Sequence, residues 1–126
     1  MGYRSDVTIS FYTSNQSELP FSAVKLWFDE NYPVKDATQE WSAEIETGDN
    51  YVNVWYMDVK WYDDYNHVQA VTKAIETFCE TFDANEKMDG AHYEMIRIGE
   101  ETQDIEREAS AYCHWLLDVS RTIRFN

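Results

Sequence analysis

The sequence contains few basic residues, cysteines, glycines and prolines, and it has no long apolar run. Ten Lys and Arg stand against 24 Asp and Glu, which gives the 126-residue chain a formal net charge of −14. A charge of this sign repels nucleic acid and anionic membranes, so we expect the protein to contact neither directly. No apolar run approaches the roughly 20 residues that a membrane-spanning helix needs.

The two cysteines, Cys79 and Cys113, are too few for a disulfide scaffold. No secretory signal is expected at the start of the chain, which favours free thiols in a reducing cytoplasm. Aromatic residues, in contrast, make up 16% of the chain and can supply a hydrophobic core. Because no linker or low-complexity tract divides the sequence, we expect residues 1–126 to form a single α+β domain.

Alternating and helical apolar patterns predict the first elements. Val7, Ile9 and Phe11 alternate with polar residues, which predicts a strand with these three side chains inward. Apolar residues then recur at spacings of three and four between Pro20 and Asn31, as expected of a helix.

Two further alternating runs, 41–46 and 51–61, flank Gly48-Asp49-Asn50 and predict a hairpin. The second of these strands is apolar on both faces, as is typical of a central strand. One face carries Trp55, Met57, Val59 and Trp61, and the other carries Val52, Val54 and Tyr56.

A second helix and a fourth strand follow. An apolar stripe marks the helix and consists of Val68, Val71, Ile75, Phe78 and Phe82. Residues 93–98 predict the strand, 100–112 a loop or short helical turn, and His114–Phe125 a final strand. The order matches the ferredoxin-like βαββαβ pattern, with two helices on one face of an antiparallel sheet. The additional C-terminal strand is expected beside the fourth, with the second sheet face open.

Acidic residues are expected on that open face and on the connection that follows the fourth strand. They are Glu40, Glu44, Glu46 and Glu94 on the sheet, and Glu100, Glu101, Asp104, Glu106 and Glu108 on the connection. Acids spaced along a surface resemble the charges of a nucleic-acid backbone, so a basic groove on another protein can accept them. The simpler alternative is an acidic face that is merely solvated.

Motifs for metals, cofactors and catalysis are weak or lacking. The 100–108 run lacks the ligand pattern and central glycine of a calcium loop, and Cys113-His114 has no second ligand pair at zinc spacing. No glycine loop for phosphate is present. Pairing Cys113 with His67 or His92 has no support from sequence spacing. We therefore expect no metal, no cofactor and no enzyme activity.

Tyr56 suggests an alternative function. Together with Val52, Val54 and Tyr12 it can form an apolar patch on the open sheet face, surrounded by acids. Such a patch is typical of a protein contact or a homodimer interface. The alternative is therefore a structural module that assembles into a homo-oligomer through this face.

Several short motifs resemble those of a group of small uncharacterised bacteriophage proteins. They are Met1-Gly2-Tyr3-Arg4-Ser5-Asp6-Val7, Asp58-Val59-Lys60-Trp61-Tyr62, Ile98-Gly99-Glu100-Glu101, Asp104-Ile105-Glu106 and Val119-Ser120-Arg121. The resemblance implies a phage accessory protein in the host bacterial cytoplasm, and it carries no catalytic residues. Combined with the charge, it predicts a non-catalytic inhibitor that binds a basic surface of a host defence or nucleic-acid-processing protein, such as a CRISPR effector.

Overall fold

The computed structural model describes residues 4–14, 18–33, 43–62, 64–87, 90–101, 104–113, 116–120 and 122–125. The elements are, in order, β1 (Ser5–Thr13), α1 (Phe21–Asn31), β2 (Ala43–Thr47), β3 (Tyr51–Val59), α2 (Asn66–Phe82), β4 (Ala91–Gly99), β5 (Ile105–Ala109), β6 (Leu117–Ser120) and β7 (Thr122–Phe125). The protein is thus α+β, as predicted. In the part of the chain that is described, no helix is both long and apolar enough to cross a membrane.

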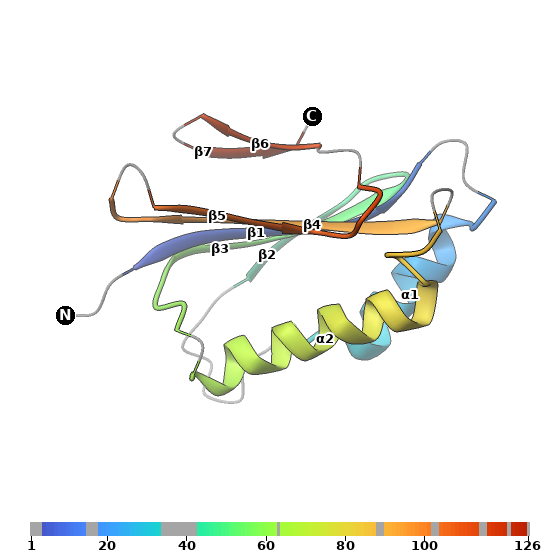
Figure 1. The fold of residues 1–126 in the computed structure, drawn as a ribbon, viewed down its shortest axis with the longest axis horizontal. Coiled ribbons are helices and arrows are strands. Elements are labelled where there is room, and N and C mark those ends of the chain that lie inside the picture. Colours follow the sequence, from blue (N-terminus) through green and yellow to red (C-terminus); the bar gives the residue numbers. More distant parts are fainter. Residues whose placement is uncertain are drawn as a thin grey trace.

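Five strands form an antiparallel sheet in the order β2-β3-β1-β4-β5. The two helices lie together on one face of this sheet (Figure 1). The predicted ferredoxin-like arrangement is matched only in part, because the sheet continues past β4 into a fifth strand. That fifth strand is not the predicted C-terminal one, since β5 lies inside the segment that was expected to be a loop or helical turn.

The core lies between the helices and the sheet. Val7, Ile9 and Phe11 of β1 are fully buried there, which confirms the predicted inward face. The ring of Phe11 lies 5.4 Å from that of Trp27 on α1 and 4.9 Å from that of Phe78 on α2, so one central side chain joins both helices to the sheet. Aromatic rings packed in this way contribute specific contacts beyond the area that they bury.

The hairpin turn between β2 and β3 is where the sequence predicts it. The Gly48 N–H donates to the Tyr51 carbonyl at 2.9 Å, which closes the turn. A Cβ at Gly48 would lie 2.1 Å from the Tyr51 ring, so a larger residue here would have to displace that side chain.

The helices cover the face of β3 that the homodimer alternative expects to lie on the open side of the sheet. Val52, Val54 and Tyr56 belong to the core beneath the helices, whereas Met57 lies on the opposite face with 51% of its surface exposed. Both faces of this strand are apolar, so the alternating pattern alone did not indicate which one the helices cover.

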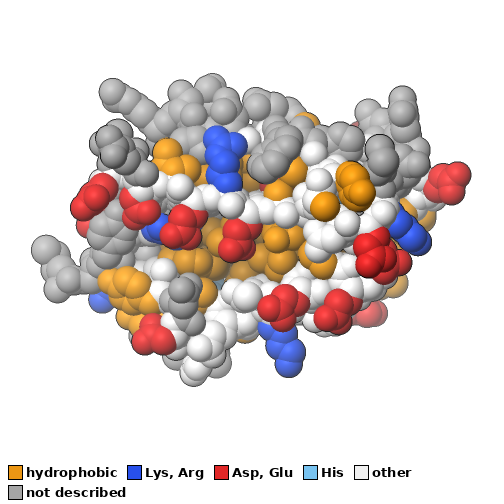
Figure 2. All heavy atoms as spheres, viewed as in Figure 1, with side chains coloured by type: hydrophobic (Ala, Val, Ile, Leu, Met, Phe, Trp, Pro, Cys, Tyr) orange, Lys and Arg blue, Asp and Glu red, His pale blue; other side chains and the backbone are white. Residues whose placement is uncertain are grey.

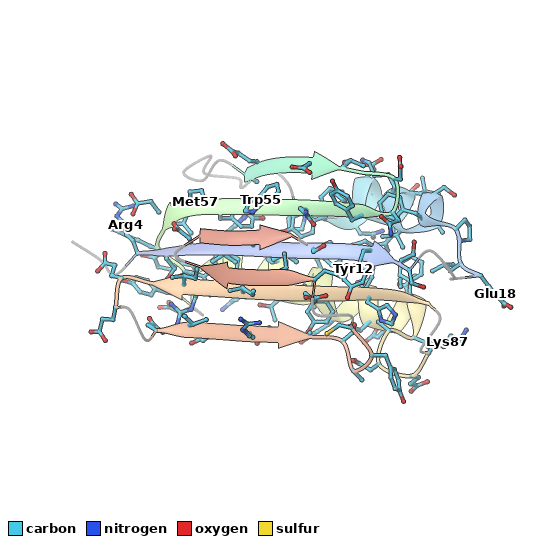
Figure 3. All side chains as sticks on the ribbon, turned by 90° about the horizontal axis from the view of Figure 1, so that it is seen from above. Arg4, Tyr12, Glu18, Trp55, Met57 and Lys87 are labelled. Carbon is cyan, nitrogen blue, oxygen red and sulfur yellow. The ribbon has the colours of Figure 1, made fainter. Side chains whose placement is uncertain are left out.

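The second sheet face is not open as predicted. β6 and β7 pair with each other as a separate two-stranded sheet, and this hairpin runs over β1 and β4 (Figure 3). The predicted single strand over His114–Phe125 is therefore wrong, because the chain reverses between β6 and β7 and lies on the sheet instead of extending it. On the sheet face opposite the helices, Thr8, Ser10 and Asn53 are buried.

Candidate protein-binding surface

The predicted partner-binding acids lie in two groups at opposite edges of the sheet. Glu44 and Glu46 are on β2, and Glu106 and Glu108 are on β5. All four side chains are exposed. Glu40 lies outside the described residues. The acids that were expected on the open sheet face and on the connection after the fourth strand thus include two pairs at separate edges of the sheet.

Arg97 on β4 organises the acids that follow it. Its Nη1 donates to Ser5 Oγ at 2.9 Å and to Asp104 Oδ2 at 3.2 Å. Its Nη2 donates to Asp104 Oδ1 at 2.7 Å and to Glu106 Oε1 at 2.8 Å. The hydrogen bond to Glu106 makes the largest contribution to raising the pKa of Arg97, and Asp104 acts in the same direction. Two of the predicted acids thus have a structural role, because they fix the β4–β5 hairpin to the sheet.

Three other acids of this hairpin, Glu100, Glu101 and Glu108, are exposed to water. Glu100 Oε1 accepts a hydrogen bond from the Arg4 backbone N–H at 3.2 Å. On the nearby helix α2, Glu76 and Glu80 are also exposed, and their i, i+4 spacing places them on the same side of the helix. We call the whole set the β5–α2 surface; it consists of Glu76, Glu80, Glu100, Glu101, Asp104, Glu106 and Glu108.

An apolar band lies within the β5–α2 surface. Figure 2 shows it between acidic side chains over β5 and acidic side chains over α2. Tyr93 and Cys79 are partly buried against the core in this region. Burial raises the pKa of Tyr93 to about 12, with smaller contributions from Cys79 and Glu108. The surface therefore combines negative charge with apolar contact area, as expected of a protein-binding surface.

The β2 edge is simpler. Glu46 Oε1 accepts a hydrogen bond from the Tyr51 hydroxyl at 2.7 Å, and this bond is the main reason why the pKa of Tyr51 is raised. Glu44 precedes it by two residues on the same face of the sheet. Compared with the β5–α2 surface, this edge is a smaller acidic group.

Glu94 is not on an exposed surface, contrary to the prediction. Only 2% of the residue is accessible, because the β6–β7 hairpin covers this part of the sheet (Figure 3). Its Oε2 accepts hydrogen bonds from the Tyr12 hydroxyl and from the Leu116 N–H at 2.9 Å, and its Oε1 accepts one from the Leu117 N–H at 3.1 Å. Glu94 therefore anchors the start of β6 to the sheet.

Tyr56 is also buried, so it cannot form the predicted contact on an open face. It is fully inaccessible, and its hydroxyl lies 2.7 Å from that of Tyr32 in a hydrogen bond. Burial raises the pKa of Tyr56 to about 12. The proposed homodimer interface of Val52, Val54 and Tyr56 is wrong for the same reason, because all three side chains pack beneath the helices.

The described residues include no group of three or more His, Cys, Asp or Glu that could hold a metal ion. Cys79 and Cys113 are free thiols, and burial raises the pKa of Cys79, which lowers its reactivity as a nucleophile. His92 is fully buried, with its Nδ1 3.5 Å from Ser110 Oγ. Its position is thus that of a core histidine packed against Tyr12.

Sequence reasoning missed the structural role of Arg97 and the strand nature of β5. The signal for β5 was the alternation in Ile105-Glu106-Arg107-Glu108-Ala109, which has the period of a strand but little apolar content. Nothing local indicated that Arg97 would be buried, since its partners follow it by seven and nine residues across a turn.

No protein-family model matches the chain, and the searches of curated proteins and of solved structures returned no match either.

Proposed function

We propose that the protein is a non-catalytic inhibitor that occupies a basic, nucleic-acid-binding surface of another protein through its β5–α2 surface. The resemblance to phage proteins makes a host defence or nucleic-acid-processing protein the target class, and the bacterial cytoplasm the place of action. We also propose a ferredoxin-like unit for β1 to β4 with the two helices, which the order β2-β3-β1-β4 supports.

One observation carries the functional proposal: exposed carboxylates form two rows, on β5 and on α2, on either side of an apolar band (Figure 2). Residues two apart on a strand and four apart on a helix are separated by about 6–7 Å. Carboxylates at this regular spacing present negative charge along each row, as phosphates do along a nucleic-acid backbone, so a basic groove can accept them.

Internal pairing leaves this charge available. Lys25 pairs with Asp29 within α1 and Lys87 with Asp83 in the turn that follows α2, and Arg97 is used inside the β4–β5 hairpin. With 24 acids and ten bases in the chain, one-to-one pairing leaves an excess of 14 carboxylates. A field of this size steers a basic partner into fast, salt-sensitive association.

The test uses the immobilised protein to capture its target from nuclease-treated bacterial extract at low and at high salt. The complex is then reconstituted from the protein and the purified target. A DNA duplex should displace the protein from that target. Reversing Glu100, Glu101 and Glu108 to Lys should weaken binding by at least about tenfold. The matched control reverses three exposed acids at the opposite edge, Glu44, Glu46 and Asp49, with the same change in net charge.

The two triple variants separate the possible outcomes. Weaker binding caused by the first set of reversals alone supports the β5–α2 surface as the binding surface. Equal losses with both sets would indicate attraction by net charge without a defined surface, and affinity unchanged by the first set would refute the proposal. A protein that binds no target and sediments as a stable oligomer would favour the assembly alternative.

A further inference from the structure

β5 is an edge strand with an unpaired outer side in the part of the chain that the structure describes. The Gly99 N–H donates to the Asp104 carbonyl at 2.8 Å, and the Ser110 N–H donates to the Tyr93 carbonyl at 3.0 Å. Antiparallel pairing alternates, so the backbone groups of residues 104, 106, 108 and 110 point toward β4. Those of residues 105, 107 and 109 therefore point away from the sheet.

The side chains of β5 alternate in the same way. Glu106 pairs with Arg97 and Glu108 with Met95, so both glutamates lie on the helix side of the sheet. Ile105 and Arg107 lie on the side of the β6–β7 hairpin, opposite Ile98 and Ile96. The edge thus offers outward-facing backbone groups, flanked on one face by Glu108 and by Glu106, which also accepts a hydrogen bond from Arg97.

A second copy of this chain is a poor occupant of the edge. Two β5 strands related by a twofold axis pair antiparallel with like faces together. The central register would place Glu106 opposite Glu108 twice and Arg107 opposite Arg107, and a shift by two residues would place one glutamate opposite itself. Like charges directly opposite each other destabilise a strand pair, so the charges of β5 protect the edge against self-association.

We propose that the β5 edge accepts an extended basic segment of the partner protein as an added antiparallel strand. Backbone hydrogen bonds to Ile105, Arg107 and Ala109 would supply affinity, as in other cases of strand addition. The side chains opposite Glu106 and Glu108 are Lys or Arg. Those opposite Ile105 and Ala109 are apolar, and the one opposite Arg107 is acidic.

The region beside the edge supports this occupant. The basic side chains of the added strand lie on the helix side, above the apolar band of Figure 2 and opposite the acids of α2. Their long aliphatic stems can cover apolar area while the charged ends meet carboxylates. The inference rests on the proposed function in one respect, namely that the partner is basic; it adds which part of the partner enters and how it binds.

The primary test uses a synthetic peptide with the core Val-Lys-Glu-Lys-Val and nitrogen-15 NMR of the full chain. The amide signals of Ile105, Arg107 and Ala109 should shift and gain protection from exchange. The control peptide has the core Lys-Val-Glu-Val-Lys, which has the same composition but exchanges Lys and Val, so that in the same register Val lies opposite Glu106 and Glu108 and the lysines lose their carboxylate partners. Equal binding of both peptides, or shifts confined to other strands, would overturn the proposal.

Two matched changes test the backbone contact itself. Arg107→Pro removes an outward N–H that the ladder to β4 does not use, and proline is tolerated at strand edges for this reason. This substitution should weaken binding of the peptide by at least about tenfold. Ile45→Pro is the control, because the Gly48–Tyr51 pairing makes its N–H point outward from β2.

An N-methylated peptide blocks the same bonds without altering the protein, and binding that survives this block contradicts strand addition.

The same variants distinguish this inference from the proposed function. If reversal of Glu100, Glu101 and Glu108 weakens binding to the host target while Arg107→Pro does not, the proposed function is supported and strand addition is refuted. If the peptide binds at β5 but no basic target responds to the reversals, strand addition stands and the proposed function fails.

Discussion

The two edges of the sheet are similar in length and charge but differ in how they are built. β2 and β5 each have five residues and two exposed glutamates spaced by two. The β2 pair lies on the hairpin side of the sheet, whereas the β5 pair lies on the helix side. Arg97 ties β5 to the sheet through Asp104 and Glu106, whereas at β2 the described residues show a side-chain hydrogen bond between Glu46 and Tyr51. The two edges therefore differ in the face on which their charges lie and in how those charges are held, and not in the number of glutamates.

Replacing Arg97, which ties the β5 edge to the sheet, should cause the largest change in stability. Arg97→Met removes charge-assisted hydrogen bonds to two carboxylates. A hydrogen bond to a charged group contributes roughly 1.5–3 kcal/mol to the stability of a protein. Both carboxylates keep access to water, so we expect a loss of about 2–3 kcal/mol in the free energy of unfolding. Urea denaturation followed by tryptophan fluorescence measures it. Arg107→Met, an exposed change on the neighbouring strand, should alter stability by no more than about 0.5 kcal/mol; equal losses would show that the network adds nothing.

How much of this could be predicted depends on whether a strand has two distinguishable faces. In β1, buried Val7, Ile9 and Phe11 alternate with polar residues, and in α2 the apolar stripe lies on one side, so both elements and their inward faces were predicted correctly. β3 is apolar on both faces, so its pattern did not show which face the helices cover, and the expected exposure of Tyr56 is wrong. β5 has a strand period but few apolar residues, so its alternation was too weak a signal to separate it from a loop or helical turn.

The candidate site was predictable in composition but not in location. The acids of 100–108 are exposed or partly exposed where the structure describes them, but Glu94 is covered because residues more than twenty positions later return over it. Contacts at such sequence separation leave no periodic pattern in the chain. The same applies to Tyr56, whose partner Tyr32 lies 24 residues earlier.

Glu94→Gln should have the second largest effect, and Glu46→Gln is its counterpart at the β2 edge. The two glutamates lie in one cross-strand row, with Asn53 and Ser10 between them. The amide of the variant would place an NH2 group against a backbone N–H of β6, which should cost about 1–3 kcal/mol. At exposed Glu46 the same change should cost about 0–0.5 kcal/mol.

Hydrogen exchange provides the specific measurement for Glu94→Gln. The amides of Leu116 and Leu117 should exchange faster in this variant, while those of β1 and β3 keep their protection. Uniform acceleration across the sheet would contradict the role of Glu94 as a local anchor of the hairpin.

Alkaline pH should weaken the fold through buried tyrosines of the interior, and not through the edges. Burial raises the pKa of Tyr56 to about 12, against about 10 in the unfolded chain. The unfolded state therefore loses this proton first, so the stabilisation is complete below pH 10 and is lost as the pH rises toward 12. Its size is of the order of 2 kcal/mol. Urea denaturation between pH 8 and 11 measures it, and a flat profile above pH 10 would contradict it.

The smallest expected effect concerns the pKa values of two tyrosines, one near each edge of the sheet. Both values are raised, but for different reasons. The pKa of Tyr51, beside β2, is raised mainly by its hydrogen bond to Glu46, whereas that of Tyr93, beside β5, is raised mainly by burial. Glu46→Gln should therefore lower the pKa of Tyr51 toward its ordinary value, while Glu108→Gln should leave Tyr93 titrating near 12. Ultraviolet titration against Tyr51→Phe and Tyr93→Phe variants assigns the two phenols. A marked fall for Tyr93 on changing Glu108 would mean that charge, and not burial, dominates at the β5 edge, so the apolar band would be more hydrated than its packing indicates.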